Sequence, residues 1–306
     1  MDNSTSIQFF YLVTFSKNST SDIFFLCAFF LIYFVGIIGN SAMIALICLD
    51  SQLHTPMYLF ICNLSVIDIL YTNAMVPKLL HMLLTRNNKI SFTQCFTQVF
   101  AFTFIAGTED VLLAAMAYDR YVAICKPLHH QRILCKRNCV LLTSGLWLYT
   151  CLNAILMAYS ASTMTFCHSV QVQQFFCDVK GLNNLFCTSS KAFYIALNVE
   201  TMLFGVIPLL CCLLSYSKII TEIMRIKTKD GRRKAFSTCS SHLTIITLYF
   251  VTAVAMYLMS PKGCGDVLYQ VFSVFCTTIT PMLNPLIYSL QNKDVRRAMK
   301  RFLGAK

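Results

Sequence analysis

The sequence places carboxylate side chains where an apolar environment makes their charge costly. Asp68 and Glu109 stand within long apolar segments, and the amides of Asn40 and Asn284 lie in two further segments of this kind. Two carboxylates at similar depth repel each other in a low dielectric, so that either one holds a proton or a cation lies between them. We therefore expect a polar core that binds Na⁺ or a proton. The alternative is a pair of neutral acids that are hydrogen-bonded to the amides or to buried water.

Two further charged features lie in the apolar segments. Asp119-Arg120-Tyr121 lies at the end of the third apolar segment, residues 95–122. There Asp119 can hold Arg120 in a salt bridge until another group displaces it. The alternative is that this pair only anchors the segment at the membrane surface. Glu200 lies in the fifth apolar segment, residues 193–217. It would bind a cationic ligand such as an amine if it faced a cavity, and otherwise it contacts a neighbouring helix.

The composition excludes most soluble classes of protein. The chain of 306 residues is 57% apolar and 12% charged, with a mean hydropathy of +0.62, whereas soluble domains are about 45–50% apolar and about 25% charged. The motifs of zinc proteases, serine hydrolases and phosphate-binding loops are missing. We expect no enzyme, no cofactor apart from an allosteric Na⁺, and no nucleic-acid partner, despite the net charge of +12.

Seven apolar segments are long enough to cross a bilayer as helices, which needs about 20 residues each. This pattern predicts an all-α membrane protein, a seven-helix bundle that forms one domain over residues 1–306. We expect a tail over 1–22, the bundle over 23–290 and an amphipathic tail over 291–306. The predicted spans are 23–49, 57–83, 95–122, 139–161, 193–217, 236–260 and 267–290.

The amphipathic tail carries apolar residues at helical spacing among Lys and Arg. Val295, Met299, Phe302 and Leu303 share one side of a helix, which predicts a short helix on the inner leaflet with membrane lipid as a partner.

The distribution of basic residues predicts the orientation. With the N-terminus outside, the loops and tails outside the spans hold 17 Lys and Arg on the inner side and 6 on the outer side, and an inner excess is the usual bias. The glycosylation sequons at Asn3 and Asn18 agree with this orientation, because they are modified only outside. We expect a multi-pass plasma-membrane protein with the C-terminus in the cytoplasm.

Four cysteines fall on the predicted outer side, where disulfides form. They are Cys95, Cys167, Cys177 and Cys187, and four cysteines allow three pairings.

Four strings in the predicted helices make the chain resemble the olfactory receptors among the rhodopsin-like G-protein-coupled receptors. FFCD at 175–178 is similar to the tetrapod-type branch of that family. The four strings are PMYLFICNLSVID at 56–68, MAYDRYVAICKPLHH at 116–130, KAFSTCSSHLT at 234–244 and PMLNPLIYSLQNKDV at 281–295.

The resemblance implies a receptor that binds small odorants in an intramembrane pocket and activates a Gs or olfactory-type heterotrimeric G protein, which raises cyclic AMP. It pairs Cys95 with Cys177 and Cys167 with Cys187. The acid that olfactory receptors carry beside Asp68 is matched by Glu109, which with Asn40 favours the Na⁺ interpretation. The resemblance assigns the switch to Asp119, Arg120, Tyr121, Tyr216, Asn284, Pro285 and Tyr288. It assigns the ligand contacts to Phe102, Thr103, Ala106, Gly107, Glu200, Phe204, Phe250, Ala253, Val254, Tyr257, Val274 and Thr277.

The chain departs from the family pattern in the sixth helix. Tyr249-Phe250-Val251 replaces the usual Phe-Tyr-Gly, so the hydroxyl points about 100° away, which argues against a ligand-triggered hydrogen bond at Phe250. At the base of this helix, Arg232-Arg233-Lys234 stands where many receptors place an acid that latches Arg120. We expect packing and the Asp68 network to hold the resting state instead. The alternatives are a non-olfactory receptor of the same fold for another small ligand and, with less support, a transporter or channel.

Overall fold

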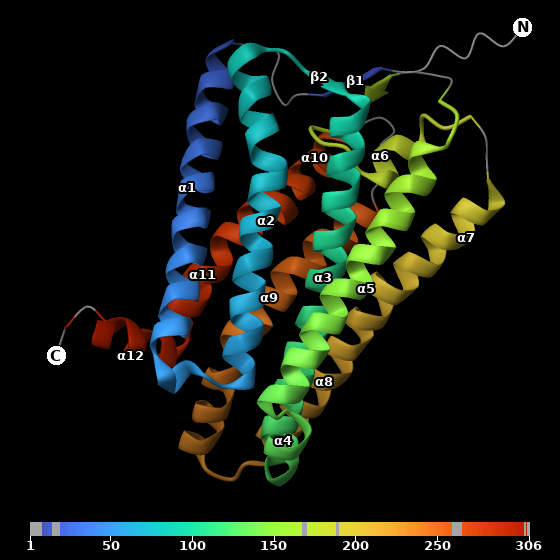
Figure 1. Ribbon diagram of the computed structural model, residues 1–306. Coiled ribbons are helices and arrows are strands. Elements are labelled where there is room, and N and C mark those ends of the chain that lie inside the picture. Colours follow the sequence, from blue (N-terminus) through green and yellow to red (C-terminus); the bar gives the residue numbers. More distant parts are fainter. Residues whose placement is uncertain are drawn as a thin grey trace, which may run out of the picture.

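The computed structural model describes residues 8–13, 19–166, 170–187, 190–258, 265–302 and 304. These residues form a bundle of long helices that run roughly side by side (Figure 1), and seven helical segments are long and apolar enough to cross a membrane. The predicted all-α, seven-helix architecture is thus confirmed. The membrane-length elements are α1 (Ser19–Leu49), α2 (Pro56–Thr85), α3 (Phe92–Cys125), α5 (Lys136–Ser162), α7–η2–α8 (Lys191–Glu200, Thr201–Val206, Ile207–Arg225), α9 (Lys229–Leu258) and α10–η3–α11 (Gly265–Val274, Phe275–Ile279, Thr280–Gln291).

The observed helices differ from the predicted spans mainly at one end of the bundle. The fifth helical segment continues to Arg225 rather than ending at 217, and α9 begins at Lys229 rather than at 236. These extra turns are rich in charged residues that water can solvate, so hydrophobicity does not mark where the helix ends.

A small sheet lies at the end of the bundle that carries the N-terminus, which we call the amino-terminal end. Its order is β2 (Lys89–Ser91), β1 (Phe9–Leu12), β3 (Gln171–Val172), with β1 antiparallel to β2 and parallel to β3. Phe10 and Leu12 of β1 are fully buried. Part of the segment that we predicted only as a tail is therefore a strand, and four residues are too short to show the alternation that predicts one. Asn3 and Asn18 lie outside the described residues.

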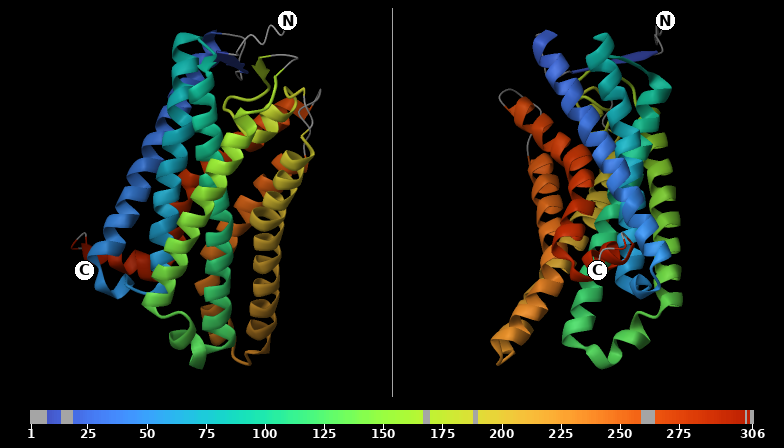
Figure 2. Two further views of the ribbon diagram at one scale, coloured as in Figure 1. Left: turned by 45° about the vertical axis from the view of Figure 1, so that its right-hand side comes forward. Right: turned by 90° about the vertical axis from the view of Figure 1, so that its left-hand side faces the viewer.

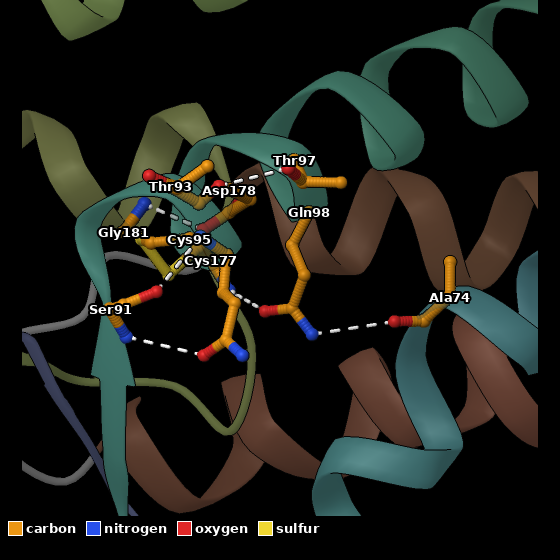
Figure 3. Close-up of a disulfide and its surroundings, with 10 residues drawn as sticks. Ala74, Ser91, Thr93, Cys95, Thr97, Gln98, Cys177, Asp178 and Gly181 are labelled. Atoms are coloured by element: carbon orange, nitrogen blue, oxygen red, sulfur yellow. Dashed lines mark hydrogen bonds between the residues drawn. A yellow bond between two sulfur atoms is a disulfide. The ribbon is translucent and has the colours of Figure 1, made fainter.

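Local sequence signals explain where several helices begin. Ser91 accepts a hydrogen bond from the Gln94 N–H, and the Gln94 side chain accepts one from the Ser91 N–H, each at 3.3 Å (Figure 3). This capping box starts α3. Pro56 and Pro127 open α2 and the short helix α4 (Pro127–Ile133), where a missing N–H costs no helical hydrogen bond.

The close approach of α1 to α11 positions the polar centre of the bundle. A Cβ atom on Gly39 would lie 3.0 Å from Pro285 Cγ, so any larger residue here would have to displace the proline ring by a few tenths of an ångström. One residue further along, the Asn40 amide donates to the Pro281 carbonyl at 2.9 Å. Gly39 thereby allows α1 to approach α11 closely enough for this hydrogen bond.

The other end of the bundle carries the remaining short elements. The 3-10 turn η1 (Ser51–Leu53) joins α1 to α2, and α4 joins α3 to α5. Helix α12 (Lys293–Phe302) lies across the axis of the bundle beside the end of α1, as the two views of Figure 2 agree. It is the predicted short amphipathic helix. We call this the α12 end of the bundle.

Candidate functional site

The polar core lies where α1, α2, α3 and α11 meet, and its members are buried. Asn284 Nδ2 donates to both oxygens of Asp68 at 3.0 Å, and Asn40 donates to the carbonyls of Gly36 and Pro281. Glu109 is 1% exposed, and neither of its carboxylate oxygens has a hydrogen-bond partner among the described residues. The charge of Asp68 acts on Glu109. The structure thus brings together the four residues that we expected in the polar core.

The donor set of this core suits a hard cation. Oxygen ligands are what such ions prefer, and the unpartnered buried atoms include Oδ1 of Asn40, Oδ1 of Asn284 and both oxygens of Glu109. No group of three or more His, Cys, Asp or Glu side chains that could hold a metal occurs within the described ranges. A cation in this core would therefore depend on two carboxylates and on amide oxygens.

Of the expected switch residues, Asp119, Arg120, Tyr216 and Tyr288 lie near the α12 end of the bundle, whereas Asn284 belongs to the polar core. Asp119 Oδ2 contacts Arg120 Nη2 at 3.4 Å, and the Asp119 side chain is 1% exposed. The hydroxyl of Tyr216 on α8 shares a hydrogen bond of 2.8 Å with Nδ1 of His242 on α9. Three nearly enclosed polar atoms have no partner in the described part of the chain: Arg120 Nε, His242 Nε2 and Tyr288 Oη. Buried polar atoms without partners are costly, so this region is a candidate for a switch between two arrangements.

His130 is a functional candidate that the sequence analysis missed. Its Nε2 lies 3.0 Å from Asp119 Oδ1, so the acid is shared between Arg120 of α3 and His130 of α4. The string MAYDRYVAICKPLHH contained this residue, but spacing alone does not place a loop helix against the helix before it. Through this contact the position of α4 is coupled to the Asp119–Arg120 pair.

The expected ligand residues lie in the half of the bundle toward its amino-terminal end, and several contact one another or aromatic neighbours. Phe102 packs against Phe176 and Tyr71, with ring centroids 5.2 and 6.1 Å apart. Phe204 covers Gly107, where a Cβ atom would lie 3.4 Å from its ring. Of the rest, Phe250, Val274 and Thr277 are buried, Thr103, Ala106 and Ala253 are partly buried, Val254 is 39% exposed, and the side chain of Tyr257 lies outside the described part.

Two of the predicted positions have definite partners. Glu200 Oε1 accepts a hydrogen bond from Asn153 of α5 at 3.1 Å, so it contacts a neighbouring helix, which was the second of the two alternatives. The displaced hydroxyl of Tyr249 donates to the Ala106 carbonyl of α3 at 3.4 Å. The hydroxyl that the family carries at the next position is therefore used here to join α9 to α3.

A concavity of about 620 Å³ lies between α3, α5 and α8, but none of the expected ligand residues lines it. Its walls include Leu142, Tyr149 and Leu214, each about half exposed or more on the outside of the bundle. It faces the surface that lipid would cover, so we do not assign the ligand region to it.

The loop between α5 and α7 closes the amino-terminal end of the bundle. A disulfide joins Cys95 of α3 to Cys177, with the Cα atoms 5.3 Å apart (Figure 3). Gln98 reinforces it, because its side chain accepts from the Cys177 N–H at 3.1 Å and donates to the Ala74 carbonyl of α2 at 3.3 Å. Cys187 is also disulfide-bonded, and Cys167, its expected partner, lies outside the described residues.

Polar contacts fasten the same loop to α9 and α10. Asp178 caps the short helix α6 (Val179–Asn183) through the Gly181 N–H at 2.8 Å and accepts from the Tyr269 hydroxyl at 3.3 Å. Lys180 Nζ donates to the Met256 carbonyl near the end of α9 and lies 4.9 Å from the centre of the Tyr269 ring. A movement of α9 or α10 would therefore displace this loop.

Asp178 makes the stability of this loop depend on pH. Burial raises the pKa of the Asp178 carboxyl to about 6, although the Gly181 N–H, the Lys180 charge and the Tyr269 hydroxyl each lower it. Since the folded chain binds this proton more tightly than the unfolded chain, the loop is most stable below the unfolded pKa, and this stability is lost as the pH rises through about 6. Lowering the pH from about 7.5 to about 5 should favour the folded wild type over Asp178→Asn by about 1 kcal/mol.

Thermal unfolding of both purified proteins at the two pH values measures this difference. Because the comparison is between two variants, titrations elsewhere in the chain cancel. A wild type that loses as much stability as Asp178→Asn, or more, on acidification would contradict the assignment.

Comparison with known proteins bears on what this arrangement does. A family model described as "Olfactory receptor" matches residues 29–306. The chain is similar to mouse olfactory receptor 1M1, at 38% identity over 99% of this chain and 97% of the relative. It is also similar to human olfactory receptor 2L3, at 40% identity over 98% and 96%. The crystal structure of squid rhodopsin shares the fold, with a TM-score of 0.73 and 16% identity over 96% of this chain and 90% of that one.

Proposed function

Because the chain belongs to the olfactory receptor family, we propose that it binds small odorants in an intramembrane pocket and raises cyclic AMP through a Gs or olfactory-type heterotrimeric G protein. As a member of this family it is a multi-pass plasma-membrane receptor for odorants and not an enzyme. In the proposed orientation the amino-terminal end of the bundle is extracellular and the α12 end is cytoplasmic, as the excess of basic residues supports.

The proposed pocket is apolar and lies below the disulfide-bonded loop. Phe102, Phe204 and Phe250 supply apolar surface, and Thr103 and Thr277 supply a few polar groups, which is the chemistry that small volatile molecules require. The hydrogen bond from Tyr249 to Ala106 links this region to the contact between α9 and α3. A ligand that binds the active arrangement more tightly shifts the population toward it, by no more than that difference in affinity.

The observation that carries the G-protein proposal is the arrangement around Asp119. In the arrangement that we take as resting, this acid contacts both Arg120 and His130, while Arg120 Nε and Tyr288 Oη are buried without partners among the described residues. Release of Arg120 gives an incoming protein a cationic contact and allows the unpartnered groups to pair. The base of α9 carries basic residues at the place where an acid could hold Arg120, so Asp119 is the acid that holds it. Release of Arg120 therefore does not require a bond between α3 and α9 to break.

The test is a cyclic AMP assay on cells that express the chain with a trafficking chaperone and an olfactory-type Gs subunit. The odorant panel includes amines, and Arg120→Ala, confirmed at the cell surface, runs beside the wild type. We expect an odorant response that disappears in Arg120→Ala. An odorant response of equal size in the variant, or a surface-expressed wild type without even constitutive coupling, would contradict the proposal.

Leu128 is expected to contribute to G-protein docking. It lies on α4, two residues before His130, and its side chain is 93% exposed at the α12 end of the bundle. An apolar side chain that becomes buried in a partner contributes about 2 kcal/mol, so Leu128→Ala should lower G-protein affinity roughly tenfold or more. The measurement is G-protein binding to the receptor in nanodiscs, with Leu128→Met as the conservative control. Binding that is unchanged in Leu128→Ala would exclude this contact.

A further inference from the structure

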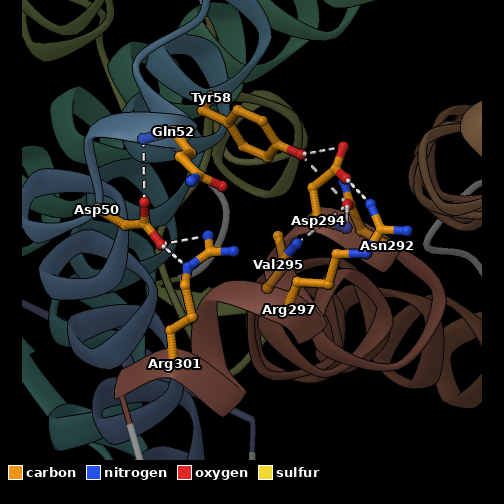
Figure 4. A network of polar contacts seen from close by, with 8 residues as sticks. All are labelled: Asp50, Gln52, Tyr58, Asn292, Asp294, Val295, Arg297 and Arg301. Carbon is orange, nitrogen blue, oxygen red and sulfur yellow. Dashed lines mark hydrogen bonds and ion pairs between the residues drawn. The ribbon is translucent and has the colours of Figure 1, made fainter.

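Helix α12 is held against the bundle along one side only (Figure 4). Val295 and Ala298 are buried. Arg301 donates to Asp50 Oδ2 from Nη2 at 2.5 Å and from Nε at 3.1 Å. This hydrogen bond holds the pKa of the Asp50 carboxyl below its ordinary value, so the pair stays charged. The Tyr58 hydroxyl donates to Asp294 at 3.3 Å. Together these contacts fix the rotation of α12 about its own axis.

The fixed rotation gathers four cations on the opposite side of the helix. Lys293, Arg296, Arg297 and Lys300 follow the spacing i, i+3, i+4, i+7, which places them on one face. They line one concavity of about 200 Å³. Among the described residues, Arg297 has a carboxylate partner, Asp294 at 3.4 Å, and the other three have none within ion-pair distance. Like charges this close destabilise a helix unless an anion joins them.

The apolar side chains of α12 indicate that this anion belongs to a membrane lipid. Met299 and Phe302 of α12 are apolar and exposed, and they share the side of Val295, opposite the four cations. A helix whose apolar side is sunk into the bilayer surface keeps its basic side at the level of the headgroups, where anionic lipids reach it. Clusters of four or more Lys and Arg directly beside the cytoplasmic end of a membrane helix favour anionic lipid over zwitterionic lipid. The end of α11 at Gln291 lies two residues before the first of these cations.

We propose that this concavity binds the headgroup of an inositol phospholipid that carries two or more phosphates on its ring, in the cytoplasmic leaflet. The proposal rests on the orientation given under Proposed function. The space is smaller than the roughly 300–1,000 Å³ of pockets for drug-sized ligands, yet four cations converge on it. One headgroup with several phosphates meets all four, whereas singly charged headgroups would have to crowd together. The two arginines match phosphate oxygens in pairs, and the two lysines act as point charges.

The test measures lipid retention on the full-length receptor by native mass spectrometry. The receptor is extracted from phosphatidylcholine nanodiscs that contain about 5 mol % phosphatidylinositol 4,5-bisphosphate and about 20 mol % phosphatidylserine, so that both lipids supply similar total charge. The wild type should retain one bisphosphate lipid in preference to phosphatidylserine. The triple variant K293Q/R296Q/K300Q should retain it on the order of a hundredfold less, since each cation near the surface contributes roughly a fivefold effect.

A matched control keeps the change of net charge but moves it elsewhere. K227Q/K229Q/R233Q removes three exposed cations, one just before α9 and two in its first turns, and should retain the lipid as the wild type does. The proposal would be overturned if both variants lost the bisphosphate lipid equally, or if the wild type retained phosphatidylserine as well as the bisphosphate lipid. Either result would show that the basic residues attract anionic lipid nonspecifically. Full lipid retention by K293Q/R296Q/K300Q together with loss of G-protein binding would assign the face to a protein partner and also overturn it. Lipid retention is independent of any odorant response, so failure here is distinguishable from failure of the receptor assignment.

Discussion

Replacing Cys177 by serine should remove most receptor from the cell surface. The disulfide to Cys95 closes a loop with a sequence separation of 82 residues, for which the chain-entropy model gives about 4 kcal/mol. The membrane already restricts the unfolded chain between these residues, so we expect about 2–4 kcal/mol. This is a large part of the 5–15 kcal/mol that a typical protein has. Loss of the bond also releases Cys177 from Gln98, which then leaves a buried amide side chain without this contact.

Surface staining and thermal unfolding of the purified receptor measure the effect. Cys27→Ser is the matched control, because Cys27 is free and exposed. Since the two sulfurs act as one unit, the double variant Cys95→Ser/Cys177→Ser should be no less stable than Cys177→Ser alone. A Cys177→Ser receptor with the surface level and unfolding temperature of Cys27→Ser would show that the loop is held by its polar contacts and not by the disulfide.

Polar contacts inside the long helices could be predicted from the sequence, and the physical reason is the absence of water in hydrocarbon. Asp68, Asn284 and Asn40 have no solvent to bind there, so the sequence alone requires that they find protein partners. The structure joins Asp68 to Asn284, and Asn40 to the Pro281 carbonyl. The sequence did not show which atoms would pair.

Contacts at the two ends of the bundle could not be predicted in this way, because water is an alternative partner for every polar group there. His130 was a loop residue with no required neighbour until the position of α4 placed it 3.0 Å from Asp119. Lys180 and Tyr269 are equally unconstrained by spacing, yet they hold the loop against α9 and α10. Phe10 lies in a strand whose partners are formed by residues about 80 and 160 positions away.

Helix rotation set a second limit on prediction. The sequence showed that the hydroxyl of the sixth helix had moved to Tyr249, but its new acceptor is a carbonyl 143 residues earlier in the chain. Glu200 likewise had two possible neighbours, a cavity or a helix, and rotation of α7 by one position would exchange them. Hydrophobicity did not decide this, because both sides of α7 carry apolar residues.

Sodium should stabilise the receptor, and Glu109 should be required for this effect. Glu109 has two buried carboxylate oxygens without partners in the part of the chain that the structure describes, and the charge of Asp68 acts on it. A buried, uncompensated charge is costly, so a cation that bridges the two acids favours the arrangement in which they face each other. At about 150 mM Na⁺ and a dissociation constant of a few millimolar, binding to the folded state contributes about 2 kcal/mol.

The unfolding temperature of the purified receptor in Na⁺ and in the large organic cation N-methylglucamine, at equal ionic strength, separates the two interpretations of these acids. If Na⁺ bridges them, the wild type gains stability in Na⁺ only, and both Glu109→Gln and Asp68→Asn lose the difference. Tyr71→Phe should keep it, because it removes a buried hydroxyl near Glu109 without changing a charge. If instead one acid holds a proton, no variant distinguishes the two cations, and Glu109→Gln, which imitates the protonated form, is as stable as the wild type in both. The choice matters for signalling, since a Na⁺ ion held between α2 and α3 must leave before these helices can rearrange, whereas a proton can remain.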